Sequence, residues 1–259
     1  MHHTTPDDET MLDRRRALRL LGGAGLGLGV ISLAGRGALA ASGSDSTIPT
    51  ATEEIPDETG GPFPGDGTNG VNVLGEEGIV RRDITSSFGA ASGVADGIPL
   101  EVVLNVQDVA NGGNPLTGAA VYVWHCDADG NYSLYSDAVT EQNYLRGVQE
   151  VDANGNATFT TIYPGCYAGR WPHIHFEVYE SLAAATDGNN AIKTSQLAFP
   201  QGVSESAYAD DRYPVSTDNL EQLSLESDMV FGEDSAALQL AIVSGDNDAG
   251  YTAVLAVGV

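Results

Sequence analysis

The chain has 259 residues, with 36 acidic side chains against 11 Lys and Arg and a formal net charge of −25. A surface with this excess of negative charge repels nucleic acids and anionic membranes, so neither is expected as a partner. Glycine is abundant (32 residues), aromatic residues make up 7% of the chain, and helix-forming residues do not cluster, which favours a single β-rich domain. The acidity fits either tolerance of salt or solubility outside the cell, and both interpretations stay open.

Residues 1–40 have the pattern of an export signal. Three consecutive arginines, Arg14 to Arg16, precede an apolar run from Leu20 to Leu33, and the small residues Ala38 to Ala40 offer a cleavage site. This pattern predicts a twin-arginine signal peptide, and hence an extracellular or cell-surface protein. A transmembrane anchor is the alternative. Because glycines interrupt the run and it is shorter than the roughly 20 apolar residues that a span needs, no membrane span is expected.

Downstream of the leader, residues 41–64 are rich in Ser, Thr, Pro, Glu and Gly, carry no period, and predict a flexible tether. From Val71 onward, short β-type runs alternate with turn signals. The predicted strands cover residues 99–107, 119–125, 157–163, 173–179, 237–243 and 251–257, with a further β-type run over 132–135. This pattern predicts an all-β domain over residues 65–259, an antiparallel β-sandwich of about eight strands with long loops that carry the functional site.

Two similar Asp/Asn-Gly turns, Asp127–Asn131 and Asp152–Asn156, each precede a β-type run. A calcium loop is the functional alternative to a simple turn. An EF-hand loop requires a glutamate at its twelfth position, where the sequence has Ala138 and Tyr163 instead. We therefore expect turns here and no calcium.

The strongest sign of chemistry is a pair of histidines one residue apart. His173 and His175 lie within the segment GRWPHIHFEVY, residues 169–179. Side chains alternate between the two faces of a strand, so the two imidazoles share one face while Ile174 and Phe176 share the other. A single histidine in a core would be ordinary, but a pair on one face predicts a metal site. Glu177, at the same spacing, is expected to end the strand or to meet solvent.

The remaining ligands decide which metal binds. Tyrosines are frequent nearby, because Tyr132 follows the first Asp-Gly turn and Tyr167 follows the Pro164-Gly165-Cys166 turn. A phenol, whose ordinary pKa is about 10, ligates only a strongly charged hard ion such as ferric iron. Zinc would instead draw on Cys126 and Cys166 together with the two histidines. Sequence spacing does not separate these two sets. For the cysteines a disulfide in an exported protein is favoured, with free buried thiols as the alternative to metal ligation.

At this point the sequence resembles the intradiol ring-cleavage dioxygenases. The resemblance runs roughly from Thr59 to the C-terminus, and its motifs are Gly61–Phe63, Val80–Ile84, Val121–Ser133, Tyr144–Gln149 and Thr161–His175. It implies a β-sandwich enzyme with a non-haem Fe(III) ion. It further implies that a small aromatic diol of the catechol type is cleaved with O2 between its two hydroxyls, giving a muconate-type diacid.

The resemblance also implies roles for individual residues. The implied metal ligands are Tyr132, Tyr167, His173 and His175, with Tyr163 outside the set. Tyr167 would leave the metal and act as a base towards the substrate. Arg170 takes the position of the catalytic arginine, which stabilises negative charge on the substrate. With both tyrosines at one ion, Cys126 and Cys166 would come near enough for a disulfide.

Several neighbours receive supporting roles. We expect His125 to face away from Trp124 and to serve packing, and the residues expected to line or brace the site are Arg146, Gln149 and Gln196. The helical dimerisation region of cytosolic family members has no counterpart between Ala40 and Gly60, so a monomer is expected. Two alternatives stay open: a secreted β-sandwich module that binds phenolic or carbohydrate ligands without turnover, and a zinc protein that uses Cys126 and Cys166. The presence of all four implied ligands and of Arg170 counts against the binding module.

Overall fold

The computed structural model describes residues 48–259. The predicted signal peptide and the first part of the predicted tether lie outside the described residues. None of the helices within residues 48–259 is long and apolar enough to cross a membrane.

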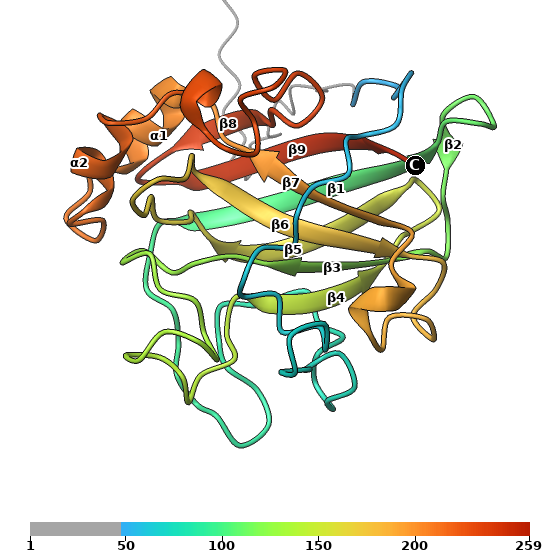
Figure 1. Ribbon diagram of the computed structural model, residues 1–259, viewed down its shortest axis with the longest axis horizontal. Coiled ribbons are helices and arrows are strands. Elements are labelled where there is room, and N and C mark those ends of the chain that lie inside the picture. The colour runs from blue at the N-terminus through green and yellow to red at the C-terminus, as the bar shows by residue number, and fades with distance from the viewer. Residues whose placement is uncertain (1–47) are drawn as a thin grey trace, which may run out of the picture. The chain divides into compact units, whose positions relative to one another are not determined.

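Nine strands and a few short helices form the described domain (Figure 1). The strands are β1 (Pro99–Asp108), β2 (Asn114–Pro115), β3 (Ala120–Trp124), β4 (Arg146–Glu150), β5 (Asn156–Ile162), β6 (His173–Tyr179), β7 (Lys193–Ala198), β8 (Ile242–Asp246) and β9 (Gly250–Gly258). The helices are the 3-10 turns η1 (Gly188–Asn190) and η2 (Leu225–Ser227) and the α-helices α1 (Gln201–Ala207) and α2 (Ser216–Leu220).

The strands build two sheets, which confirms the predicted all-β sandwich. One sheet has the order β2-β1-β9-β8, with β5 also paired to β1, and the other has the order β4-β3-β6-β7. Pairing is antiparallel throughout except between β1 and β9, which run parallel from the Leu100–Tyr251 pair to the Gln107–Gly258 pair. The predicted antiparallel arrangement is wrong for that one pair, because the connection between these strands contains the whole second sheet.

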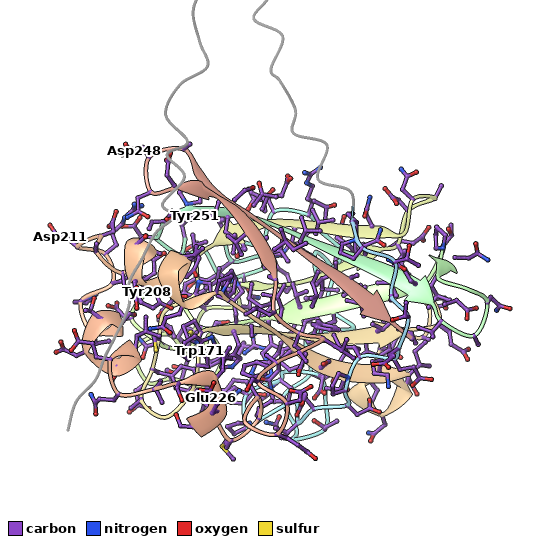
Figure 2. The ribbon with its side chains drawn as sticks, turned by 90° about the horizontal axis from the view of Figure 1, so that it is seen from above. Trp171, Tyr208, Asp211, Glu226, Asp248 and Tyr251 are labelled. Atoms are coloured by element: carbon purple, nitrogen blue, oxygen red, sulfur yellow. The ribbon has the colours of Figure 1, made fainter. Side chains whose placement is uncertain are left out.

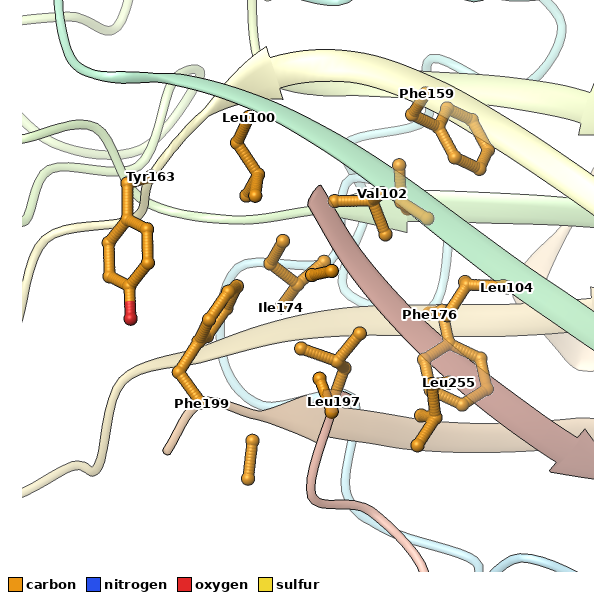
Figure 3. Packing of buried hydrophobic residues seen from close by; sticks show 14 of the residues in the cluster. Leu100, Val102, Leu104, Phe159, Tyr163, Ile174, Phe176, Leu197, Phe199 and Leu255 are labelled. Atoms are coloured by element: carbon orange, nitrogen blue, oxygen red, sulfur yellow. The ribbon is translucent and has the colours of Figure 1, made fainter. Parts of the chain in front are cut away.

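Apolar side chains that alternate along the strands form the core between the sheets. Figure 3 shows Leu100, Val102 and Leu104 of β1 opposite Ile174 and Phe176 of β6, with all five side chains at most 1% exposed. Burying such side chains is worth about 1.5–3 kcal/mol each. This packing fixes which face of β6 points away from the core.

The outer face of the β4-β3-β6-β7 sheet is covered as well. All five residues of β3 are buried, and alternate members belong to different clusters: Val121 and Val123 to the inner core, Tyr122 and Trp124 to a second cluster outside. The second cluster also contains Tyr132 and Val148, and in Figure 1 the long loops drawn in blue-green and green gather on this side of β3 and β4. A sheet buried on both faces can hold polar side chains away from water on its outer face.

The described part of the predicted tether, residues 48–64, packs on the sandwich, so the expectation of a flexible linker is wrong there. Ile55 is only 2% exposed, and its N–H donates to the Gly258 carbonyl over 3.0 Å. The N–H of Glu58 donates to the Thr194 carbonyl over 2.8 Å. Backbone hydrogen bonds to strand ends, rather than a strand pattern in its own sequence, hold this segment.

Other element predictions need correction. The β-type run 132–135 is not a strand, because it forms turns and Leu134 has a φ of 71°. The strand predicted over 237–243 lies farther along the chain, as β8. Strands β4 and β7 and both α-helices were not predicted, because β4 and β7 are short and bury polar residues such as Arg146 and Gln196.

Candidate metal centre

Strand β6 begins at His173 and presents the two histidines on its outer face, as the alternation predicts. His173 and His175 are 2% and 3% exposed, and Ile174 and Phe176 between and beyond them belong to the inner core. Glu177 continues the histidine face. It does not end the strand or meet solvent as expected: it is 3% exposed and accepts a hydrogen bond from the Tyr179 hydroxyl, and burial raises the pKa of its carboxyl to about 8.

The ring of His173 is held with its Nε2 unprotonated. Its Nδ1 lies 2.5 Å from the carbonyl oxygen of Trp171, and since a carbonyl only accepts, Nδ1 carries the proton and donates it. Burial, with a smaller contribution from the charge of Arg170, lowers the pKa of His173 to about 3. A neutral imidazole with this tautomer is the form that ligates a metal through Nε2.

The ring of His175 is fixed by stacking. It lies parallel to the indole of Trp124, with centroids 4.9 Å apart and planes within 7°, because the two residues are register partners on β6 and β3. Gly61 approaches the same ring, so that a Cβ there would lie 3.4 Å from His175 Cε1. Burial, followed by the charge of a protonated His173, holds the pKa of His175 well below its ordinary value.

The two tyrosines reach the histidines from separate loops. Tyr132 directly follows the Asp127–Asn131 turn, in which Asp127 Oδ1 accepts hydrogen bonds from two backbone N–H groups of the same turn. Tyr167 follows the Pro164–Cys166 turn. The Tyr132 hydroxyl lies 3.4 Å and the Tyr167 hydroxyl 3.3 Å from His173 Nε2. The two hydroxyl oxygens are 3.5 Å apart, and the Nε2 atoms of the two histidines are 3.1 Å apart.

These distances fit four donors around one cation. Donor atoms bound ~2 Å from a common ion lie roughly 3 Å from each other. His175 Nδ1 has no hydrogen-bond partner within residues 48–259, so no contact holds its proton there. With the proton on Nδ1, the two Nε2 lone pairs would face each other at 3.1 Å, an arrangement that a cation between them stabilises. Burial raises the pKa of Tyr132 well above its ordinary value and that of Tyr167 to about 12, so both stay protonated without a metal. Deprotonating both phenols requires a highly charged ion, which fits Fe(III) better than a divalent metal.

The alternative zinc site does not form within residues 48–259. No cluster of three or more His, Cys, Asp or Glu side chains there is placed to hold a metal. Cys126 and Cys166 are both buried and directed at different backbone carbonyls, those of Gly165 at 3.4 Å and Arg170 at 3.6 Å. Neither thiol faces the histidine nitrogens.

The expected disulfide between Cys126 and Cys166 is also absent from the structure, where both cysteines are free. Burial raises the pKa of the Cys166 thiol to about 12 and that of Cys126 still further. Both side chains therefore behave as small, protonated core residues. The two cysteines adjoin the segments that carry the two tyrosines, as expected, but their sulfur atoms contact different carbonyls and are not bonded to each other.

Arg170 lies beside the four donors, and it is not the surface arginine that an acidic protein could have had. Its side chain is 11% exposed. Nε donates to Asp228 Oδ2 over 3.0 Å and Nη2 donates to Gln196 Oε1 over 2.6 Å. Of these partners, Asp228 was not singled out from the sequence. An acidic residue in a loop carries no distinctive signal in a chain with 36 of them.

Of the other residues expected near the site, some support a neighbouring segment and some make no contact with the four donors. Arg146 is buried and braces the 63–64 segment, because Nη2 donates to the Phe63 carbonyl and Nη1 to the Pro64 carbonyl. His125 is not among the four converging groups: its ring nitrogens are hydrogen-bonded to Thr161 and to the Cys126 carbonyl, which fits the packing role expected of it. Within residues 48–259 the side chain of Gln149 bonds only to the neighbouring Val148 carbonyl and to none of the four donors. Tyr163 lies in the inner core, with its hydroxyl 2.8 Å from Ser204.

The four donors and Arg170 differ in their exposure to solvent. Tyr167 and Arg170 are partly exposed, and Ala168 and Gly169 between them are exposed. Tyr132 and both histidines are at most 3% exposed. A small molecule therefore meets Tyr167 and Arg170 first, while the other three donors stay sheltered.

Comparisons with known proteins identify relatives of this part of the chain. A family model described as "Dioxygenase" (Dioxygenase_C) matches residues 89–182, a range that includes all four donors and Arg170. The chain is 44% identical over 63 residues to a chlorocatechol 1,2-dioxygenase from Rhodococcus opacus, covering 24% of each protein. It is 34% identical over 122 residues to the β chain of a protocatechuate 3,4-dioxygenase from Burkholderia cepacia, covering 41% of this chain and 50% of the relative.

The matched regions thus span a quarter to a half of the length of these two curated relatives. Among solved structures, an intradiol ring-cleavage dioxygenase from Tetranychus urticae superposes with a TM-score of 0.63 at 25% identity. That match covers 80% of this chain and 94% of the other. Sequence and structure therefore point to the same enzyme family.

Proposed function

We propose that this relative of the intradiol ring-cleavage dioxygenases is a non-haem Fe(III) enzyme that cleaves a catechol-type ring between its two hydroxyls, with O2, to a muconate-type diacid. The observation that carries the proposal is the convergence of two phenol oxygens and two imidazole nitrogens within 3.1–3.5 Å of their neighbours. The proposed ligands are Tyr132, Tyr167, His173 and His175. When bound, Fe(III) would act as a Lewis acid that holds a catecholate and makes its ring reactive towards O2.

The chain's own residues divide the remaining work. Tyr132 is the buried phenol, so its proposed role is that of a permanent, negatively charged phenolate ligand of the metal. Tyr167 is the partly exposed phenol and the one that an incoming diol meets, so it is the group that can accept a hydroxyl proton from the substrate. His173 and His175 supply neutral, oriented nitrogens, because Trp171 and Trp124 fix their rings.

Arg170 is the cationic side chain at this centre. Its guanidinium can donate hydrogen bonds to an oxygen that becomes negative during the reaction. Removing one such donor typically lowers turnover by about 10²–10³-fold. A module that only binds ligands would need neither a directed arginine nor four converging donors, so nothing in the site favours that alternative. Export by the twin-arginine route and the monomeric state stay predictions.

The decisive experiment combines colour, metal content and oxygen uptake. The purified protein should contain iron and show a tyrosinate-to-iron charge-transfer band that shifts when catechol is added, and catechols should consume O2 and yield a muconate-type product. Tyr132→Phe and His175→Ala should lose both the band and turnover. Tyr163→Phe is the matched control, since this tyrosine lies in the core, and it should keep both.

Arg170→Ala separates binding from chemistry: it should keep the band and lose about 10²–10³-fold in rate. A colourless protein that contains zinc would overturn the metal assignment. A coloured iron protein that consumes no O2 with any catechol would instead favour the binding module.

A further inference from the structure

Asp228 is a buried carboxylate with all its contacts directed at the metal centre's surroundings. Its side chain is 0% exposed. Oδ2 accepts hydrogen bonds from Arg170 Nε over 3.0 Å and from the Trp171 N–H over 2.7 Å. Oδ1 accepts from the N–H groups of Val230 and Phe231 over 2.8 and 3.1 Å. One carboxylate therefore joins the loop before β6 to the segment after η2.

These contacts keep Asp228 charged. Burial alone would raise the pKa of Asp228, but the Trp171 N–H, the Arg170 guanidinium and the N–H groups of its own turn together hold it below the ordinary value. A buried carboxylate needs a partner of opposite charge, and Arg170 is the cation that pairs with it. The buried Asp228 carboxylate thus restrains the guanidinium of Arg170 more than an exposed ion-pair partner would.

The guanidinium of Arg170 is held at two of its three nitrogens. Asp228 takes Nε and Gln196 takes Nη2. Gln196 is itself fixed, because its Nε2 donates to the Thr59 carbonyl over 2.9 Å. Nη1 has no hydrogen-bond acceptor among residues 48–259. An arginine has five N–H donors in a rigid plane, so fixing two nitrogens also fixes the direction of the two donors on the third.

The Asp228 turn also positions an aromatic wall. The Phe231 ring lies 5.9 Å from Arg170 Cζ and 6.4 Å, centroid to centroid, from the His173 ring. Figure 2 labels Trp171 and Glu226 of η2 in the same part of the view, and the hydrogen bond from the Trp171 N–H to Asp228 joins their two segments. The segment 225–231 therefore contacts both the arginine and one histidine of the centre.

We propose that Asp228 is the positioning residue for Arg170, and that its carboxylate orients the guanidinium so that Nη1 is left to donate to the substrate. The inference rests on the proposed function, because it assigns a role relative to the substrate. It also makes Arg170 a directed donor within a neutral pair instead of a free positive charge. Asp228 acts through Arg170 and does not itself touch the reacting atoms.

A double-mutant cycle in the full-length iron-loaded protein tests this. Asp228→Asn should lower kcat by about 10²-fold, the scale of loss when a catalytic group is misplaced by about 1 Å. In an Arg170→Gln background, the same Asp228→Asn change should cost less than about 2-fold, because the group that Asp228 positions is already gone. The charge-transfer band and iron content should match those of the parent protein in all three variants.

Asp210→Asn is the matched control, since Asp210 forms an ion pair of similar length with Arg212; it should leave kcat unchanged. Full activity of Asp228→Asn, or losses that multiply in the double variant, would overturn the positioning role. The arginine Nε–Hε NMR signal that disappears in Arg170→Gln gives a readout independent of turnover, and it should shift in Asp228→Asn. If the wild-type protein turns over no catechol, the proposed function fails. An unshifted arginine signal in Asp228→Asn would instead refute the proposal that Asp228 positions Arg170.

Discussion

The histidines at residues 125, 173 and 175 show how position decides the role of one residue type. All three are buried, yet two aim their Nε2 atoms at a shared point and the third is satisfied by Thr161. Strand alternation predicted this division, because it places His125 opposite to Trp124 and puts His173 and His175 on one face. Asp228 could not be predicted in the same way. Its role depends on a contact with Arg170 across 58 residues of chain, which no local pattern encodes.

His125 leads to a pH prediction. Burial, with a smaller effect of Arg146, lowers the pKa of His125 to about 4 despite its bond to the Cys126 carbonyl, against about 6.5 in an unfolded chain. Between these values the unfolded state binds more protons than the folded state. The free energy of unfolding should therefore fall as pH drops from about 6.5 to about 4, by about 3 kcal/mol from this residue, and change little further below.

Urea denaturation of the metal-free protein at several pH values checks this, with His125→Gln as the comparison. His125 is also among the charges that lower the pKa of His173 and of His175, but it is the last of the named causes for each, so the difference between the two pH profiles reports mainly His125. If wild type and His125→Gln lose stability in parallel over this window, the assigned shift is wrong.

Among the elements, β6 and the segment that lies against it determine the site. The sequence predicts β6 within its observed bounds because apolar and histidine positions alternate over 173–179. It does not predict that residues 60–63 cover the histidine face, since a Gly-Pro-rich stretch is equally typical of a linker. The Gly61-Pro62-Phe63 motif of the family was the signal for this covering role. Phe63 also packs on Tyr132, with ring centroids 5.1 Å apart.

Gly61→Ala should disturb the site through this segment. Gly61 has a φ of +71°, which costs an L-residue about 1–2 kcal/mol, and a Cβ would lie 3.4 Å from His175 Cε1. We expect a loss of stability of about that size and a shift of the charge-transfer band, both measurable on the purified protein. Gly89→Ala is the control: its φ is +66° with nothing within 4 Å, so it should lose similar stability and keep the band. Equal spectra in both variants would contradict the contact with His175.

At the scale of the whole molecule, negative charge is spread over the surface and positive charge is scarce. Exposed carboxylates such as Asp211 and Asp248 project from loops in Figure 2. Each of the six basic side chains within residues 48–259 already bonds to a carboxylate or to backbone carbonyls: Arg81, Arg82, Arg146, Arg170, Lys193 and Arg212. Apart from Nη1 of Arg170, which the proposed role assigns to an oxygen of the reacting diol, the described residues offer no cationic group without such a partner to pair with an acidic substituent on a substrate ring.

This inventory predicts selectivity among catechols. A ring-carboxylated catechol would bring a further negative charge to a strongly acidic surface, so its kcat/KM should be at least about tenfold below that of catechol, equivalent to ~1.4 kcal/mol. Because salt screens such repulsion, the ratio should shrink at high ionic strength. Steady-state oxygen uptake with both substrates at low and high salt measures it. Preferential turnover of the carboxylated substrate would refute the inference that no cationic group is available for its carboxylate.

The parallel pairing of β1 with β9 has a consequence for how the molecule folds. Leu100 pairs with Tyr251, so the larger sheet closes only when segments from opposite ends of the domain meet, and such distant contacts form slowly. The smaller sheet, which carries the histidines, uses only residues 120–198. We therefore expect the amides of β3 and β6 to gain protection from hydrogen exchange earlier during refolding than those of β9. The two histidines of β6 would then be in place before the larger sheet is complete.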